Sequence, residues 1–115
     1  MNRNEETKLQ AAGQIVADHI FAAEHAFDRA YLAMAEACAA LPIARMETNT
    51  AAESAQQSYI GAAETLRELA TARGRLMRCH REVAVWATRV GLEPSSFGGG
   101  AGKPLVEPAQ EPVAA

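Results

Sequence analysis

The chain has 115 residues, of which 49% are apolar and only 5% aromatic, so its length fits one small domain. β-Sandwiches and β-barrels need β-branched and aromatic residues at alternate positions, and the alanine-rich composition excludes them. Eleven basic and fourteen acidic residues give a net charge of −3, which disfavours a general polyanion-binding protein.

No segment approaches the roughly 18 uninterrupted apolar residues of a membrane-spanning helix. The first residues, Met1 to Glu6, are polar and acidic and lack the apolar core of a secretory signal, so we expect a cytoplasmic protein. Cys38 and Cys79 are too few for a disulfide framework and lack metal-ligand spacing. We therefore expect buried free thiols and neither a metal nor a cofactor.

Two long segments carry apolar residues at alternating steps of three and four, a spacing typical of helices that bury one line of residues, the seam. In the first segment these positions are Leu9, Gly13, Val16, Ile20, Ala23, Phe27, Ala30, Met34, Ala37 and Leu41. In the second they are Ala52, Ala55, Tyr59, Ala62, Leu66, Leu69, Arg73, Leu76, His80, Val83, Ala87 and Val90. The pattern predicts an all-α fold of two long antiparallel helices, a helical hairpin with a coiled-coil-like, alanine-rich seam.

The first helix is predicted over about residues 5–41. Asn2 or Asn4 is suited to cap its start, because a short polar side chain can accept a hydrogen bond from a free backbone amide. Pro42 lacks an amide and disfavours helix at Leu41, so we expect the helix to end there.

The second helix is predicted over about residues 51–90. Thr50 to Glu53 has the spacing of a capping box at its start, and Gly91 is suited to a left-handed cap at its end. The connecting loop 42–50 is short, so the helices must be antiparallel neighbours within a hairpin domain of residues 1–91. With this loop, the numbers of facing residues add to roughly 92.

Residues 92–115 differ in composition from the hairpin. Four prolines and four glycines among these 24 residues predict a disordered Gly/Pro-rich tail. Its last residues, Ala114 and Ala115, resemble the small apolar tags that bacterial unfoldase–proteases recognise, but low-complexity drift is the favoured interpretation.

The small side chains of the predicted seam allow the helix axes to approach closely but bury little area. Burial contributes about 25 cal/mol per Å² of apolar surface, so a single hairpin of this kind is marginally stable. We therefore expect self-association into a homodimer or four-helix bundle.

Four large apolar residues fall outside the predicted seams and are candidates for contact with a protein partner. Phe21 and Leu32 lie eleven residues apart and share one side of the first helix, and Val85 and Trp86 lie outside the seam of the second. They favour a buried interface, although the tail could cover them or Trp86 could be partly exposed.

Arg67, Arg78 and Arg89 repeat every eleven residues and form a basic stripe on the second helix. Such a stripe could contact phosphates, an anionic surface or an acidic protein. Alternatively, it is a solvated face whose arginines pair with nearby glutamates at helical spacing. The absence of a second basic element favours the solvated face over nucleic-acid binding, whereas a protein contact stays open because arginine is frequent in interface hot spots.

Polar residues also interrupt the predicted seam. In the predicted register Gly13 faces His80, and His19 approaches Arg73. This layer could be a pH-sensitive histidine pair or a weak ligand pocket. The favoured interpretation is a structural layer that fixes register and oligomeric state.

The sequence has no nucleophile–base arrangement and no phosphate-binding glycine loop, so an enzyme is not expected. The favoured hypothesis is a non-enzymatic helical hairpin that self-associates and binds a protein partner as an adaptor, regulator or chaperone-like accessory. The alternative is binding to nucleic acid or an anionic surface through the arginine stripe.

Overall fold

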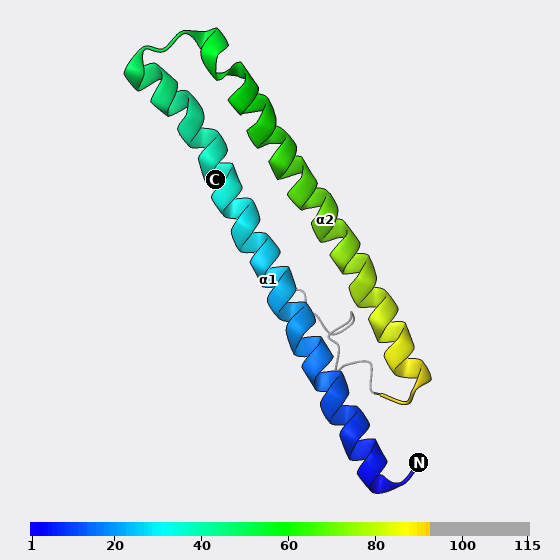
Figure 1. Ribbon diagram of the computed structural model, residues 1–115. Coiled ribbons are helices and arrows are strands. Elements are labelled where there is room, and N and C mark those ends of the chain that lie inside the picture. The colour runs from blue at the N-terminus through cyan, green and yellow to red at the C-terminus, as the bar shows by residue number, and fades with distance from the viewer. Residues whose placement is uncertain (93–115) are drawn as a thin grey trace, which may run out of the picture. The chain divides into compact units, whose positions relative to one another are not determined.

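The predicted helical hairpin is present in a computed structural model, which describes residues 1–92 (Figure 1). Helix α1 spans Arg3–Thr48, a short 3₁₀ helix η1 spans Ala52–Ala55, and helix α2 spans Gln56–Arg89. These described residues contain no strand. The all-α prediction of two long antiparallel helices is therefore confirmed. Apart from Leu92, the residues of the predicted tail lie outside the described part of the chain.

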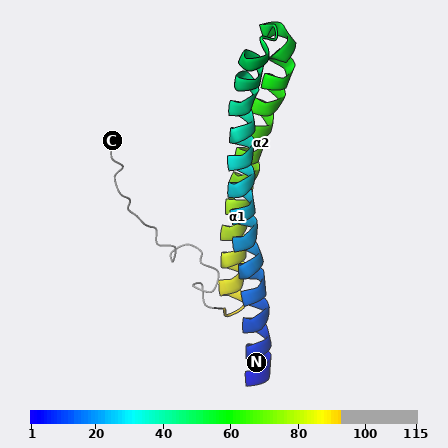
Figure 2. The same ribbon diagram turned by 90° about the vertical axis from the view of Figure 1, so that its left-hand side faces the viewer.

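Contacts within the chain divide it into two compact units. We call residues 23–76 the turn unit, because they include the connection between the helices. We call the other one the terminal unit, whose described residues are 1–22 and 77–92. Within each unit, a stretch of α1 lies beside a stretch of α2 in both views (Figures 1 and 2).

A capping box fixes the start of α1, and its cap is Asn2, one of the two residues predicted for this role. The Glu5 amide donates to Oδ1 of Asn2 over 2.8 Å, and the Asn2 amide donates to Oε1 of Glu5 over 3.0 Å. These reciprocal bonds satisfy two backbone donors at the helix start that have no carbonyl partner within the helix.

The predicted end of the first helix at Pro42 is wrong. Pro42 lies inside α1, which continues for six more residues to Thr48. A proline there deprives the Cys38 carbonyl of its intrahelical donor and costs about 3 kcal/mol in a helix interior. The residues on both sides of Pro42 are helical, so the proline penalty does not end the helix.

Helix α1 ends instead in a left-handed residue, Asn49, with a φ of 55°. The Thr50 amide donates to the Arg45 carbonyl over 3.1 Å, and the Asn49 amide donates to the Met46 carbonyl over 3.3 Å. This pair of bonds is a Schellman motif, in which asparagine can take the position that glycine usually holds. Asn49 is thus the signal in the sequence for the helix end that we assigned to Pro42.

The capping box expected to open the second helix is also absent. Ala51 precedes η1 without a side-chain cap, and the Thr50 hydroxyl lies 2.6 Å from the Thr48 hydroxyl. Thr50 is already held by the end of α1, so its side chain is not available to cap α2.

A second Schellman motif ends α2, and here the predicted cap at Gly91 is confirmed. Gly91 has a φ of 96°, the Leu92 amide donates to the Ala87 carbonyl over 2.8 Å, and the Gly91 amide donates to the Thr88 carbonyl over 3.1 Å. Leu92 is buried with Ala87, which is the apolar contact that usually accompanies this motif.

Substitution by alanine should have opposite effects on stability at Gly91 and at Gly74. A Cβ added at either position would meet no atom within 4 Å, so packing does not distinguish them. Gly91→Ala should lower the free energy of unfolding by about 1–2 kcal/mol, because alanine is strained at positive φ. Gly74→Ala, inside α2, should raise it by about 0.5–1 kcal/mol. Urea unfolding followed by circular dichroism checks both, and equal effects at the two sites would contradict the assigned cap.

The predicted seam is correct for α2 and partly wrong for α1. Every predicted position from Ala55 in η1 to Val90, directly after α2, is buried or half-buried, whereas the first predicted position, Ala52, is exposed. In α1, Ala17 is 1% exposed whereas the predicted Val16 is 38% exposed. The buried positions near the start of α1 therefore advance by four from Leu9, and the predicted seam alanines Ala30 and Ala37 are exposed.

The register of the helices also differs from the prediction. Asp28 pairs with Arg73 in the turn unit and Phe21 with His80 in the terminal unit, so the paired numbers add to 101 in both units. The shift from the predicted value of about 92 follows from the later end of α1, which moves the centre of the turn toward residue 51.

Candidate functional site

The densest packing in the described chain lies in the terminal unit. Ala17 is 1% exposed, Ala87 0% and Leu92 3%. The partly buried residues packed against them are Leu9, Phe21, Val83, Ala84 and Val90. Two alanines at the centre allow the helices to approach closely but leave little apolar area per layer.

His80 is buried in this unit, with 6% of its surface exposed. Its ring lies edge-on to the Phe21 ring, with centroids 5.5 Å apart and an interplanar angle of 90°. This T-shaped contact is a favourable aromatic geometry, so His80 belongs to the packing of the terminal unit.

The predicted polar layer of His19, Arg73 and His80 does not form as a group. His19 is exposed, and the expected approach of His19 to Arg73 is replaced by an ion pair between Arg73 and Asp28. The Arg73 Nε donates to Oδ1 of Asp28 over 2.9 Å. The register is the physical reason. The turn comes later in the chain than predicted, so Asp28 rather than His19 faces Arg73.

The Arg73–Asp28 pair connects α1 to α2 within the turn unit. Its side chains are 40% and 57% exposed, so water and salt screen the attraction between them. Exposed pairs of this kind contribute about 0–1 kcal/mol, and this one specifies register more than it adds stability.

Of the four apolar residues predicted to contact a partner, three are exposed and Phe21 is not. Phe21 is half-buried against the core of the terminal unit, because the seam of α1 passes one residue later than predicted. Leu32 is 59% exposed in the turn unit. Val85 and Trp86 are 52% and 49% exposed in the terminal unit.

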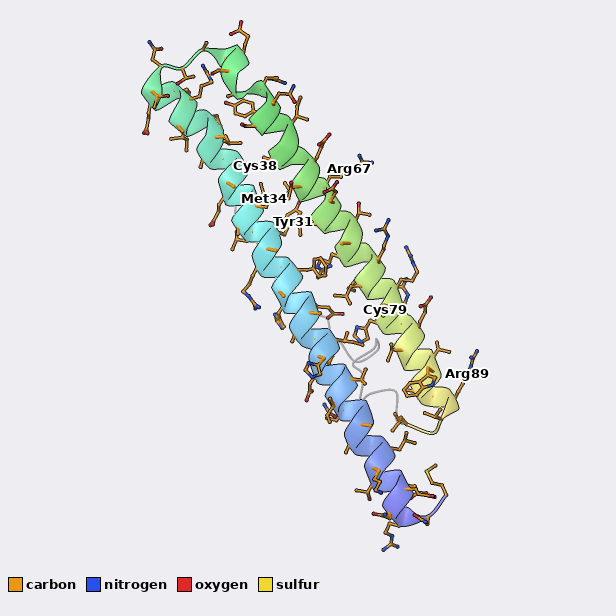
Figure 3. All side chains as sticks on the ribbon, in the orientation of Figure 1. Tyr31, Met34, Cys38, Arg67, Cys79 and Arg89 are labelled. Carbon is orange, nitrogen blue, oxygen red and sulfur yellow. The ribbon has the colours of Figure 1, made fainter. Side chains whose placement is uncertain are left out.

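Arg67, Arg78 and Arg89 are exposed, as the stripe requires. Figure 3 shows Arg67 in the turn unit and Arg89 in the terminal unit, each pointing away from the α1 stretch of its unit. A shallow depression on α2 in the turn unit is lined by Glu64, Arg67, Glu68, Thr71 and Arg75. The surroundings of Arg67 therefore carry both signs of charge.

Further large apolar residues, which the apolar pattern did not predict to be on the surface, are exposed in the structure. Ile43 and Met46 on α1 are 51% and 62% exposed, because the helix continues past Pro42 and carries them outward. Ile15 is 58% exposed in the terminal unit, and Tyr31 and Ile60 are 43% and 40% exposed in the turn unit. A signal for Ile43 was present, because it lies eleven residues after Leu32 and so returns to nearly the same side of a helix.

Two open grooves lie between α1 and α2 in the turn unit. One is mostly apolar and is lined by Cys38, Leu41, Pro42, Tyr59, Ala62 and Ala63. The other is lined by Asp28, Tyr31, Ala70, Arg73 and Gly74. Figure 3 shows Tyr31, Met34 and Cys38 on the side of α1 that faces α2. Half-buried residues line most of the first groove, whereas exposed residues line most of the second, and none of residues 23–76 is fully buried.

Metal-binding groups, free thiols and membrane-spanning helices can be checked directly in the described residues. Within residues 1–92 no three His, Cys, Asp or Glu side chains are placed to hold a metal ion. Both cysteines are free thiols, but the expectation that they are buried is wrong, because Cys38 is half-buried and Cys79 is exposed. In the part of the chain that the structure describes, neither helix has the length and apolar character needed to cross a membrane.

Comparison with protein-family models, curated proteins and solved structures gave no match for this chain.

Proposed function

We propose that this chain is a non-enzymatic helical hairpin that self-associates and binds a protein partner, in the role of an adaptor, regulator or chaperone-like accessory. The surface available for this role consists of exposed apolar side chains on both units. Ile43 and Leu32 supply it in the turn unit, and Val85 and Trp86 supply it in the terminal unit.

The observation that carries the proposal is the lack of burial in the turn unit, where none of residues 23–76 is fully buried. Folding stability comes mainly from apolar area removed from water, at about 25 cal/mol per Å², and each ordered residue costs about 1.5 kcal/mol in conformational entropy. A two-helix unit without one buried side chain therefore needs burial from outside itself. A second copy of the chain is always present to supply it.

The terminal unit supplies the surface proposed for a different protein partner. Val85 lies between Arg78 and Arg89 on α2, and the exposed Trp86 is its neighbour. Tryptophan and arginine are the residues most enriched in interface hot spots, where a large ring and a planar guanidinium bury together.

Binding to nucleic acid or an anionic surface is the alternative, and the exposure of Arg67, Arg78 and Arg89 supports it. Glu64 and Glu68 share the depression that Arg67 lines, and their charges oppose the approach of phosphates. Binding to a polyanion would weaken steeply with salt through loss of counterion release, whereas an apolar protein interface would weaken much less.

Sedimentation velocity over about 1–100 µM protein tests the self-association. We expect a species of twice the 12.2 kDa monomer mass. Its fraction should increase with protein concentration, and it should persist when salt is raised to about 0.5 M. A monomer at all concentrations would contradict the proposal. An assembly that dissociates completely in high salt would also contradict it, because salt weakens an apolar interface much less than contacts between charges.

A further inference from the structure

The side of α1 turned away from α2 in the turn unit carries an ordered pattern of charge and apolar residues. We call it the outer stripe, and it consists of Arg29, Leu32, Glu36, Ala39, Ala40, Ile43 and Glu47. All seven are exposed, and apart from the adjacent pair Ala39 and Ala40 they follow one another at steps of three or four, so they share one helix face. The half-buried residues Phe27, Cys38 and Leu41 lie on the other side of the same helix.

The two ends of the outer stripe carry opposite charges. Arg29 and Glu47 are 18 residues apart, which is five full turns at 3.6 residues per turn and gives both side chains one direction. Neither has an oppositely charged residue three or four positions away on α1. Within residues 1–92 neither of them forms an ion pair.

The apolar residues of the stripe are placed symmetrically between these charges. Leu32 lies one turn after Arg29, and Ile43 lies one turn before Glu47. Leu32 is 59% exposed and Ile43 51%. The small residues Ala39 and Ala40 lie near the centre, where they let a second helix approach closely.

The ends of this pattern are complementary to their own reverse. When two copies of α1 lie antiparallel across the stripe, Arg29 of one copy faces Glu47 of the other, and Leu32 faces Ile43, each contact occurring twice. Glu36 faces the small residues Ala39 and Ala40, about one turn from Glu36 of the other copy, so these two like charges oppose part of the attraction. A parallel pair would instead place Arg29 against Arg29 and Glu47 against Glu47, and like charges in contact are unfavourable.

We propose that the outer stripe is the homodimer interface and that its occupant is the outer stripe of a second copy, antiparallel to the first. The contact is isologous, as a two-fold symmetric dimer requires. It gives each turn unit the apolar burial that it lacks by itself, and the two charge pairs set the direction and register of the helices. The inference rests on the self-association proposed above and adds to it the interface and the arrangement.

Charge exchange across the interface tests the arrangement. Arg29→Glu places two carboxylates against each other, and Glu47→Arg places two guanidinium groups against each other, in both cases twice per dimer. We expect each single variant to dimerise about tenfold more weakly than the wild type in sedimentation equilibrium at about 50 mM salt. The double variant R29E/E47R, and an equimolar mixture of the two single variants, restore both opposite-charge contacts. Both should dimerise within about threefold of the wild type.

The control for these charge changes is Lys8→Glu, an exposed reversal on α1 in the terminal unit, which should leave the dimer unchanged. Helix content by circular dichroism verifies that each variant is folded. A wild type that dimerises while all the charge variants dimerise equally well would overturn the interface and leave self-association standing. A wild type that is monomeric throughout would overturn both.

The apolar part of the stripe has a closely matched control. Leu32 and Ile15 are 59% and 58% exposed, both on α1, but only Leu32 belongs to the stripe. Leu32→Glu should weaken dimerisation more than tenfold, because it buries a carboxylate against Ile43 of the second copy. Ile15→Glu should leave it unchanged, and equal losses in the two variants would overturn the assignment.

Discussion

Replacing Ala87 by leucine is expected to destabilise the hairpin by about 1–3 kcal/mol. Ala87 is 0% exposed and packs with Ala17 and Leu92 in the terminal unit. The three added carbons have no space unless α1 moves away from α2, and that movement would also separate the neighbouring layer of Phe21 and His80. Urea unfolding followed by circular dichroism measures the change in the free energy of unfolding.

Ala22→Leu is the matched control, since it is the same substitution at an exposed position of the same unit. It should change the free energy of unfolding by no more than about 0.5 kcal/mol. If Ala87→Leu were as stable as Ala22→Leu, Ala87 would not lie between the helices and the register described for the terminal unit would be wrong.

Pro42→Ala is expected to stabilise the protein by about 2 kcal/mol. An alanine amide restores the hydrogen bond to the Cys38 carbonyl and removes a proline penalty of about 3 kcal/mol in the helix interior. Part of the gain is offset because proline also restricts the unfolded chain, an effect of about 0.4–1 kcal/mol. Thermal and urea unfolding measure the net change.

Ala44→Gly separates this explanation from a general effect of losing proline. Ala44 is exposed and lies inside α1, two residues after Pro42. Glycine there should lower the free energy of unfolding by about 1 kcal/mol. If α1 ended at Leu41, residue 44 would be in a loop. In that case both Pro42→Ala and Ala44→Gly would change the stability by less than about 0.5 kcal/mol.

The contrast between the helices shows which parts of the fold the sequence could predict. In α2, charged residues such as Glu64, Arg67, Arg78 and Glu82 mark the outer face, so the apolar positions define one seam. In α1, alanine occurs on every face, and the apolar pattern is satisfied by two neighbouring lines of residues. The seam of α1 was therefore assigned to Val16 where Ala17 is buried.

The register could not be derived because it depends on where the turn lies. Proline usually ends a helix, and this local preference was given more weight than the helix formers that follow Pro42. The asparagine at position 49, which takes the left-handed conformation, was the better signal. An error of seven residues in the helix end moved every facing pair, including those of His80 and Arg73.

The candidate surface was predicted in part. Leu32, Val85 and Trp86 are exposed as expected, because each lies clearly outside a seam. Phe21 is packed beside His80, since the seam of α1 differs from the predicted one. Ile43 falls in the predicted loop. The sequence therefore does not predict the outer stripe, which exists only because α1 extends to Thr48.

Hydrogen exchange measured by mass spectrometry at several protein concentrations tests most directly whether a second copy supplies the burial that residues 23–76 lack. Between about 1 and about 100 µM protein, amides in this unit should exchange at least tenfold more slowly as the dimer forms, with the largest change in peptides covering 29–47. Exchange in these peptides that is independent of protein concentration would contradict the account.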